Sequence, residues 1–201
     1  MKKAFHIILS ILLTLPFVAC QEKGEEYEFD NWQKKNEQYI DSIAQIARSG
    51  KGWTMYKSYN LGDSLDMNGE NKFYIYVQKL ENGNGKASPL FNDSVRVHYK
   101  GYLIPSATYP TGYCFDKSYS GSVLNLDTDV PTLFGVNSVV KGFSTALMHM
   151  KEGDYWRVVI PYYLGYGTED KGKIPGYSTL VFECYLARIY NYKKGDNTDW
   201  H

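Results

Sequence analysis

Strand-like segments in the second half of the chain place the strongest constraint on its fold. Residues 94–103 alternate in side-chain character, which is the two-residue period of a strand with two different faces. One face would carry Val95, Val97 and Tyr99, and the outward face Arg96, His98 and Lys100. Residues 73–77, 155–160 and 179–189 are rich in β-branched and aromatic side chains, which strands favour. Together these segments predict an antiparallel sheet.

One short helix accompanies the strands. Residues 142–150 are amphipathic, and Gly153 provides a stop. The strands around this helix are joined by turns such as Asn-Gly-Asn-Gly at residues 82–85. The order predicts an α+β fold with the helix across one face of the sheet.

A longer helical pattern precedes the strands. Over residues 31–48, apolar side chains recur at spacings that form one stripe on a helix: Trp32, Tyr39, Ile43, Ile46 and Ala47. We expect Asp30 to cap this helix and Gly50 to end it. The stripe predicts a helix packed on its own domain, and the alternative is a dimerisation helix. Residues 50–71 have the composition of a loop, with a strand at residues 53–59.

Composition excludes some classes of partner. The 22 acidic and 22 basic residues balance, so the charge does not predict binding to nucleic acid or to an acidic polymer. With 201 residues and 43% hydrophobic content, the chain is long enough for one sizeable core. The 19 tyrosines against nine phenylalanines favour half-buried strands with amphipathic surfaces over a dedicated aromatic recognition surface.

The N-terminal residues have the pattern of an export signal. Lys2 and Lys3 precede an apolar run at residues 4–18, which is too short for a membrane-spanning anchor. Phe-Val-Ala-Cys at residues 17–20 resembles the lipobox of bacterial lipoproteins, in which the cysteine is lipidated and begins the mature chain. Phe17 stands where the lipobox usually has Leu, so cleavage by an ordinary signal peptidase is the alternative.

The lipobox resemblance implies a signal peptide at residues 1–19, a lipidated Cys20 and an outer-membrane lipoprotein that faces the periplasm or the cell surface. Several lipid chains on one cysteine would anchor the protein firmly. The acidic segment that follows, residues 20–30, is predicted to be a solvated tether. It resembles the surface-export tracts of Bacteroidota lipoproteins.

The sequence has no constellation for metal, nucleotide or nucleophilic chemistry. It contains no phosphate-binding glycine loop, no Cys/His cluster with metal-ligand spacing and no Ser-His-Asp set. His98, on the outward face of its strand, and His149, on the short helix, are expected to be surface or packing residues. We therefore predict no cofactor.

Six motifs follow one another along the strands and the short helix. They are Val-His-Tyr-Lys-Gly at 97–101, Phe-Asp-Lys-Ser at 115–118, Val-Val-Lys-Gly-Phe at 139–143, Met-Lys-Glu-Gly at 150–153, Ile-Pro-Tyr-Tyr-Leu-Gly-Tyr-Gly at 160–167, and Ile-Pro at 174–175 with Leu-Val-Phe-Glu at 180–183. In this order they resemble FKBP-type peptidyl-prolyl isomerases. The resemblance implies an FKBP-like domain at residues 72–190, with a curved antiparallel sheet wrapped on one short α-helix. The helical extension at residues 31–71 would precede it, and a polar tail at 191–201 would follow.

The resemblance also implies a proline-binding site. Its walls would be the residues at the family's positions: Tyr99, Phe115, Val139, Val140, Phe143, Tyr166 and Phe182, with Ile174 closing one side. The N–H of Val140 and the hydroxyl of Tyr166 would hydrogen-bond the carbonyls beside the proline, and Asp116 would orient the Tyr99 hydroxyl. A plain core role is the alternative for Tyr99 and Phe182.

The implied activity is isomerisation of X-Pro peptide bonds in exported proteins during folding. Rotation about such an amide meets a barrier of about 18–20 kcal/mol. The twisted amide has less charge separation than the planar one, so an apolar pocket favours it. Proline-containing polypeptides are the expected partners, with macrolides as ligands, and a monomer is expected rather than a dimer. The alternative is a non-catalytic FKBP-like binding or scaffold module.

The sequence departs from the family's pattern around the pocket. Phe143 stands where Trp is usual, and Val130 or Thr132 falls where a pocket phenylalanine is common, which predicts a thinner wall. Residues 102–114 and 118–132 are longer than usual, and each stretch could extend the groove or cover it.

The resemblance bears on the cysteines as well. If Phe115 and Phe182 point inward, strand alternation turns Cys114 outward and Cys184 inward. A disulfide between them would then need distortion, so we predict two free thiols with Cys184 buried.

Overall fold

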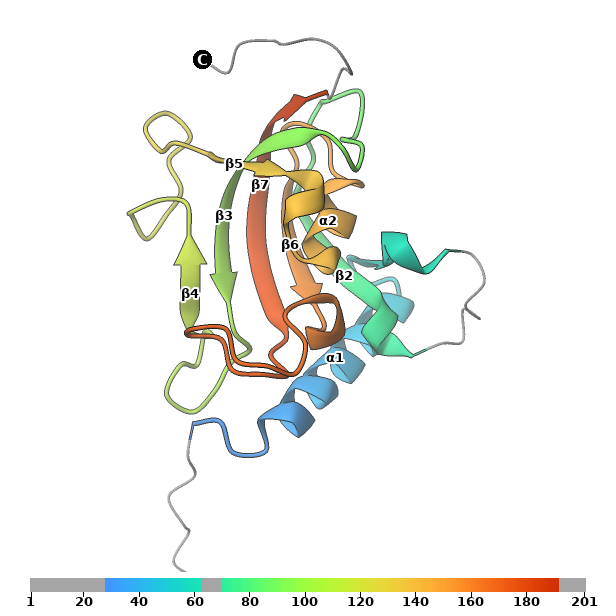
Figure 1. Ribbon diagram of the computed structural model, residues 1–201, viewed down its shortest axis with the longest axis vertical. Coiled ribbons are helices and arrows are strands. Elements are labelled where there is room, and N and C mark those ends of the chain that lie inside the picture. Colours follow the sequence, from blue (N-terminus) through green and yellow to red (C-terminus); the bar gives the residue numbers. More distant parts are fainter. Residues whose placement is uncertain (1–27, 63–69, 192–201) are drawn as a thin grey trace, which may run out of the picture.

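The computed structural model describes residues 28–62 and 70–191 (Figure 1). The predicted signal peptide, Cys20 and most of the acidic tether lie outside the described residues, as does the polar tail from residue 192. The elements are α1 (Trp32–Arg48), β1 (Trp53–Lys57), β2 (Tyr74–Glu81), β3 (Ser94–Tyr102), β4 (Cys114–Lys117), β5 (Thr132–Gly135), α2 (Lys141–Leu147), β6 (Tyr155–Ile160) and β7 (Leu180–Tyr190), with four short 3₁₀ turns.

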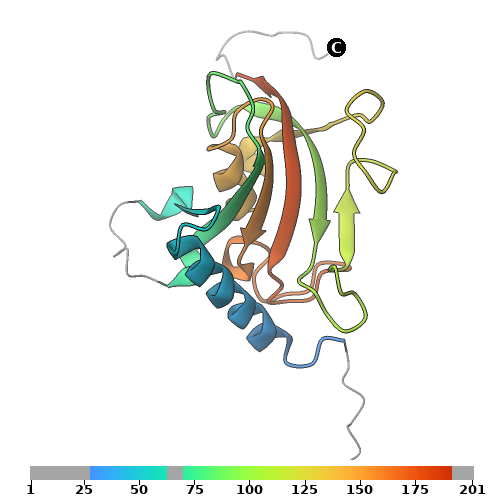
Figure 2. The ribbon, with the colours of Figure 1, turned by 180° about the vertical axis from the view of Figure 1, so that it is seen from behind.

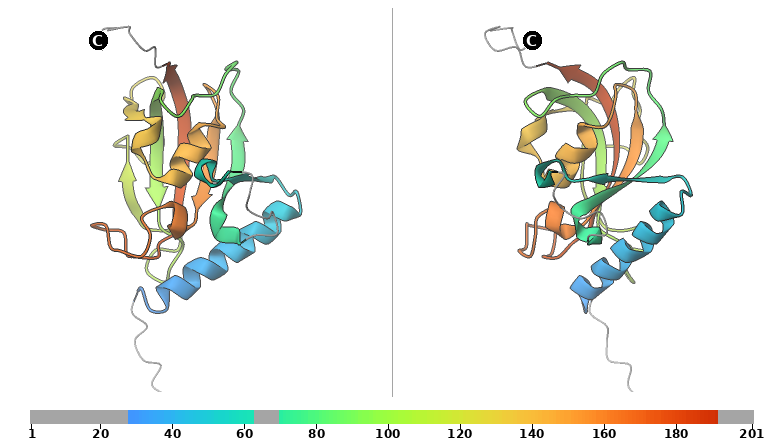
Figure 3. Two further views of the ribbon diagram at one scale, coloured as in Figure 1. Left: turned by 45° about the vertical axis from the view of Figure 1, so that its right-hand side comes forward. Right: turned by 90° about the vertical axis from the view of Figure 1, so that its right-hand side faces the viewer.

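The strands form one antiparallel sheet in the order β1-β2-β6-β7-β3-β4. The short β5 pairs with the first half of β3, through Val97↔Thr132, while β4 pairs with the second half, through Lys100↔Lys117. Both short strands therefore share one sheet edge. The sheet curves around α2 on its concave face, and α1 crosses the opposite face near one end (Figures 2 and 3). The predicted α+β fold, an antiparallel sheet curved around one short helix, is confirmed.

The main core fills the space between α2 and the concave face of the sheet. Its fully buried members include Ile75, Val77, Val95, Val97, Leu147, Trp156, Val158 and Leu186. Each such aliphatic side chain contributes about 1.5–3 kcal/mol relative to exposure. Gly142 allows α2 to lie directly on β6, because a Cβ there would stand 2.3 Å from Ile160 Cγ2. The short helix is thus fixed tightly against the sheet.

The N-terminal helix packs on its own domain, as predicted. Ile40, Ile43, Ala44 and Ala47 are buried against side chains that include Tyr76, Val159 and Val181. The predicted stripe was wrong at one position, since Ile46 is 39% exposed while Ile40 and Ala44 are buried. Asn36, Ile40 and Ala44, which are spaced four residues apart on one side of the helix, are all buried.

The predicted ends of this helix were half right. The residue before the helix is Asn31, with a left-handed φ of 53°, so Asp30 does not cap it. Gly50 follows the last turn with a φ of 69°, which is the conformation of a glycine that ends a helix. Within residues 28–62 and 70–191, no helix combines the length and the hydropathy needed to cross a membrane.

The other expected elements formed with shifted boundaries. The strand expected at 53–59 ends at Lys57, and the helix expected over 142–150 spans Lys141–Leu147. The prediction that His98 faces outward was correct in direction, but this side chain is only 3% exposed. Burial lowers the pKa of His98, and Asp129, in the loop after β4, opposes that shift.

Candidate functional site

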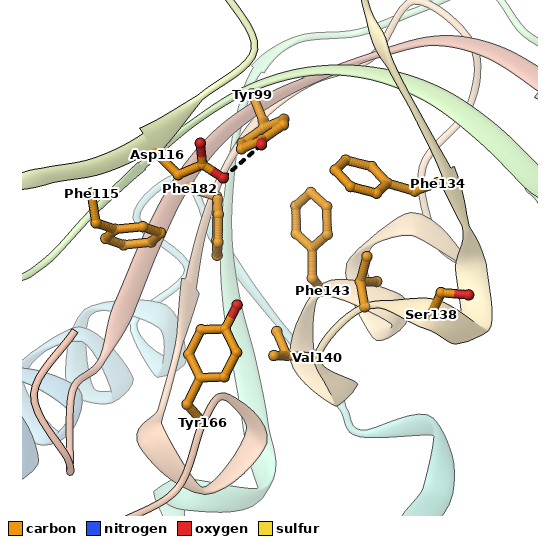
Figure 4. Close-up of a pocket in the computed structure, with 10 residues that line it drawn as sticks. Tyr99, Phe115, Asp116, Phe134, Ser138, Val140, Phe143, Tyr166 and Phe182 are labelled. Atoms are coloured by element: carbon orange, nitrogen blue, oxygen red, sulfur yellow. Dashed lines mark hydrogen bonds between the residues drawn. The ribbon is translucent and has the colours of Figure 1, made fainter. Parts of the chain in front are cut away.

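A cavity of about 410 Å³ lies between the concave face of the sheet and the N-terminal end of α2 (Figure 4). β3, β4, β5, β7, α2 and the loop after β6 all contribute to its wall. The lining residues are Tyr99, Phe115, Asp116, Phe134, Ser138, Val139, Val140, Phe143, Tyr166 and Phe182. Eight of these ten side chains are aromatic or aliphatic, and the two exceptions are Asp116 and Ser138. The cavity is therefore predominantly apolar.

Aromatic rings in mutual contact form the base of the cavity. Phe182 and Phe143 are 7% and 4% exposed, and their ring centroids are 4.8 Å apart. Phe115 meets Phe182 edge-on at 5.6 Å, which is a favoured geometry for two aromatic rings. Gly101 of β3 makes this packing feasible, because a Cβ there would lie 2.5 Å from Phe115 and 2.8 Å from Phe182.

The polar groups stand at the rim. The Tyr99 hydroxyl donates a hydrogen bond of 2.7 Å to Asp116 Oδ2 (Figure 4). Burial raises the pKa of Tyr99 well above its usual range, and the Asp116 carboxylate and Tyr166 raise it further. Tyr99 is therefore a neutral phenol at physiological pH, held by a carboxylate that is itself exposed.

Tyr166 stands across the cavity from Tyr99. It is 42% exposed, and Figure 4 shows its hydroxyl pointing from the loop toward the cavity, near Phe182. Val140 precedes the first turn of α2, where its carbonyl accepts hydrogen bonds from the N–H groups of Phe143 and Ser144. Among the described residues, the N–H of Val140 has no hydrogen-bond acceptor. Two donors thus remain for a ligand.

Comparison with known proteins identifies this arrangement. The family profile described as FKBP-type peptidyl-prolyl cis-trans isomerase matches residues 85–187. The chain belongs to this family.

Individual members of the family support the assignment. The chain is 40% identical over 122 residues to the macrophage infectivity potentiator of Trypanosoma cruzi, which covers 60% of this chain and 56% of that protein. It is 34% identical over 124 residues to FK506-binding protein 1A of Neurospora crassa, covering 61% and 93%. A crystal structure of a peptidyl-prolyl cis-trans isomerase from Pseudomonas syringae aligns with a TM-score of 0.55 and 26% identity, over 79% of this chain and 96% of that one. The chain thus spans little more than half of the Trypanosoma relative.

Eight of the nine site residues predicted from the FKBP motifs line the cavity. The exception is Ile174, which is 7% exposed and packs into the main core. It lies in the same loop as Tyr166, between β6 and β7. The predicted hydrogen bond between Tyr99 and Asp116 is present.

Two lining residues, Phe134 and Ser138, were missed. Phe134 lies 5.6 Å from Tyr99 between ring centroids and fills the wall that the sequence predicted to be thin. That expectation was wrong, since Val130 is 71% exposed and the phenylalanine comes from β5 after a longer loop. The pairing Val95↔Phe134 shows how β5 reaches the FKBP pocket. The sequence signal that could have found Phe134 is its spacing of two residues from Thr132, which places both side chains on the same face of a strand.

The two long stretches do not supply lining residues to this cavity. Residues 119–126, from the second stretch, instead line a separate cavity of about 370 Å³ on the opposite face of the sheet. There they meet Tyr102, Tyr155 and Tyr185. Neither residues 102–114 nor residues 118–132 therefore contribute to the wall of the FKBP pocket.

The remaining sequence predictions concern the cysteines and metals. Cys114 and Cys184 are free thiols and Cys184 is buried, as predicted. Burial raises the pKa of the Cys184 thiol well above its usual range, which makes it a packing residue. In the part of the chain that the structure describes, no three His, Cys, Asp or Glu side chains gather as metal ligands.

Proposed function

We propose that this protein is a peptidyl-prolyl cis-trans isomerase. The observation that carries the proposal is the apolar aromatic cavity with unused hydrogen-bond donors at its rim. Phe115, Phe143 and Phe182 offer a proline ring apolar contact, while Tyr166 and the N–H of Val140 can bind the carbonyls on either side. The peptide bond that precedes a proline is the one that readily populates both the cis and the trans isomer.

The cavity would act through differential binding. Water and charged neighbours stabilise a planar amide, because its resonance separates charge. They stabilise the twisted amide less, because it has lost that resonance. Removing water and charge from around the bond therefore disfavours the planar ground state. Each 1.4 kcal/mol gained by the twisted state over the planar one gives about tenfold in rate. Asp116 is the single ionisable carboxylate of the lining, and the Tyr99 hydroxyl engages it.

An isomerisation assay on an X-Pro peptide tests the proposal. The purified chain should accelerate exchange between cis and trans peptide, and both Phe115→Ala and Tyr166→Phe should lower kcat/KM. Thr54→Ala, at an exposed position of β1, is a control with no expected effect. A folded protein that leaves the uncatalysed rate unchanged would contradict the isomerase proposal and favour a non-catalytic binding module.

Ligand binding gives an independent measurement. We infer that the partners are proline-containing polypeptides and that a macrolide can occupy the same cavity. FK506 is the natural probe, since one relative is named for binding it. A ligand of the native state raises the melting temperature, so FK506 should stabilise the chain and compete with the peptide. Phe182→Ala should remove the shift.

We infer that the protein is a lipoprotein of the outer membrane that assists folding of exported proteins. Lys2, Lys3, the apolar run at residues 4–18 and Cys20 support this inference. Incorporation of labelled palmitate, lost in Cys20→Ser, tests the lipid. Cleavage without a lipid would point to an ordinary signal peptidase. Protease accessibility on intact cells then separates the cell surface from the periplasmic side.

We also infer a monomer. The apolar side chains of α1, including Ile40, Ile43 and Ala47, are buried against the sheet of the same chain. They are consequently not available to pair with a second copy. Light scattering across a concentration series should give the mass of one chain, and a dimer mass would overturn the inference.

A further inference from the structure

The loop between β6 and β7, residues 161–179, is tied to α1. This loop carries Tyr166, whereas α1 lies outside residues 85–187, the segment that matches the family profile. Figures 1 and 3 show the loop beside the N-terminal half of the helix. A segment that precedes the FKBP domain therefore contacts the loop that completes its pocket.

The first tie is a chain of hydrogen bonds from Trp32. Its indole Nε1 donates to Ser178 Oγ at 2.8 Å, and Ser178 Oγ donates to the carbonyl of Pro175 at 2.6 Å. Trp32 and Ser178 are 6% and 3% exposed. Since water does not compete at a buried site, these two hydrogen bonds fix the C-terminal end of the loop.

The second tie is Asn36, which is fully buried. Its Nδ2 donates to the carbonyl of Trp32 at 2.7 Å, and its Oδ1 accepts the N–H of Thr179 at 2.7 Å. Asparagine is unfavourable within a helix, and a buried amide is tolerated only with its hydrogen bonds made. Asn36 thus serves the junction between the helix and the loop rather than the helix itself.

The loop's own hydrogen bonds carry these ties to Tyr166. Gly167, the next residue, donates its N–H to the carbonyl of Tyr162 and accepts the N–H of Tyr177, both at 2.9 Å. Tyr177 adjoins Ser178 and has a left-handed φ of 62°. A residue other than glycine keeps such a conformation only where its surroundings enforce it. The sequence of contacts runs from α1 through Ser178, Tyr177 and Gly167 to Tyr166.

We propose that α1 is a positioning element for Tyr166, and that Trp32 and Asn36 are positioning residues of the pocket. The proposal rests on the isomerase function for its kinetic consequence. When the ties are broken, the loop spends less time in the conformation that places the Tyr166 hydroxyl at the cavity. The apparent affinity of any ligand that uses this hydroxyl falls by the same fraction.

Two conservative substitutions should break the first tie while keeping the fold. Trp32→Phe keeps a buried ring and removes the indole donor, and Ser178→Ala removes the hydroxyl that links Trp32 to Pro175. Ser42→Ala is the matched control, because its exposed hydroxyl also bonds a carbonyl of α1, that of Gln38. Asn36→Ala leaves buried groups unpaired, so it serves as a third variant only where it folds.

Hydrogen exchange and kinetics measure the effect. Trp32→Phe and Ser178→Ala should speed amide exchange at residues 166–178 and lower kcat/KM about two- to tenfold, the scale of one lost hydrogen bond. Ser42→Ala should change neither. Unchanged exchange at residues 166–178 in both variants would overturn the proposal.

Coupling to Tyr166 separates positioning from general destabilisation. In a Tyr166→Phe background, Trp32→Phe should lower kcat/KM by less than about twofold, because the group that it positions is already gone. Equal losses in both backgrounds would overturn the proposal. If the chain proves to have no isomerase activity, FK506 affinity replaces kcat/KM in the same cycle. Failure of the isomerase function is thereby distinguished from failure of the positioning role.

Discussion

The two faces of the sheet carry aromatic side chains in very different surroundings. On the concave face, the rings of Phe115, Phe143 and Phe182 contact one another. On the outer face, Tyr102, Tyr119, Tyr155 and Tyr185 line a cavity together with Lys100, Glu81 and Glu183. Arg157 pairs with Glu183 there at 2.6 Å. The concave cavity has one carboxylate at its rim, whereas charged groups of both signs are spread across the outer one.

The difference shows which face suits a peptide-bond rotation. Charged groups and solvated hydroxyls stabilise a planar, dipolar amide. The outer face would therefore bind the planar ground state at least as tightly as the twisted state, and such binding does not accelerate rotation. The concave face offers mainly aromatic carbon. Four of the 19 tyrosines line the outer cavity, where an apolar ring with a polar end suits a half-exposed surface.

The largest contrast should come from two positions of β7. Phe182→Ala removes a ring that is 7% exposed and should cost about 3–5 kcal/mol of unfolding free energy, with a loss of FK506 binding and isomerase activity. Tyr185→Ala, on the outer face of the same strand, should leave activity within about twofold. Denaturant unfolding and the peptide assay measure both variants. Equal losses of activity would show that the outer face takes part.

A smaller contrast tests two tyrosines that each donate to a carboxylate. Tyr99 donates to Asp116 at 2.7 Å on the concave face, and Tyr155 donates to Glu183 at 3.3 Å on the outer face. Each Tyr→Phe change should cost about 0.5–1.5 kcal/mol of stability. Only Tyr99→Phe should lower kcat/KM, by a few-fold. A matching fall for Tyr155→Phe would remove the distinction between the faces.

The outer face is also closed over His98, which makes stability depend on pH. Burial lowers the pKa of His98 below its usual 6.5 in the folded protein, with Asp129 opposing the shift. The unfolded chain therefore binds more protons below pH 6.5, and stability falls as the pH decreases from 7 to 5.5.

Melting temperatures across this range test the role of His98. His98→Leu should reduce the slope with pH without removing it, because burial and Lys79 also lower the pKa of His149. An unchanged slope in His98→Leu would contradict the assignment.

The smallest effect is expected from the ion pair on the outer face. The Arg157 and Glu183 side chains are 41% and 22% exposed, and exposed pairs of this kind contribute about 0–1 kcal/mol. Arg157→Gln should lower stability within that range, less so in high salt, and leave kcat/KM unchanged. A loss of activity would connect the outer face to the pocket.

The local sequence pattern predicted the positions of helices and strands better than the tertiary contacts that their side chains make. The alternation at residues 94–103 placed β3 correctly, and the six motifs placed eight lining residues. The wall residue Phe134 escaped because the length of the preceding loop decides which residue of β5 meets Val95. Ile174 fits the motif but packs inward. Both outcomes depend on loop geometry, which no periodic pattern encodes.

The sequence by itself determined the antiparallel sheet, the short helix and the aromatic residues around the pocket other than Phe134, because these follow from side-chain periodicity and from motifs a few residues long. Only the tertiary structure decided what lies on the outer face and what holds the loop of Tyr166. The bonds from Trp32 to Ser178 and from Asn36 to Thr179 join residues 146 and 143 positions apart. Such contacts depend on how a helix packs on a sheet. Burial then strengthens each hydrogen bond, because water does not compete for its donor and acceptor.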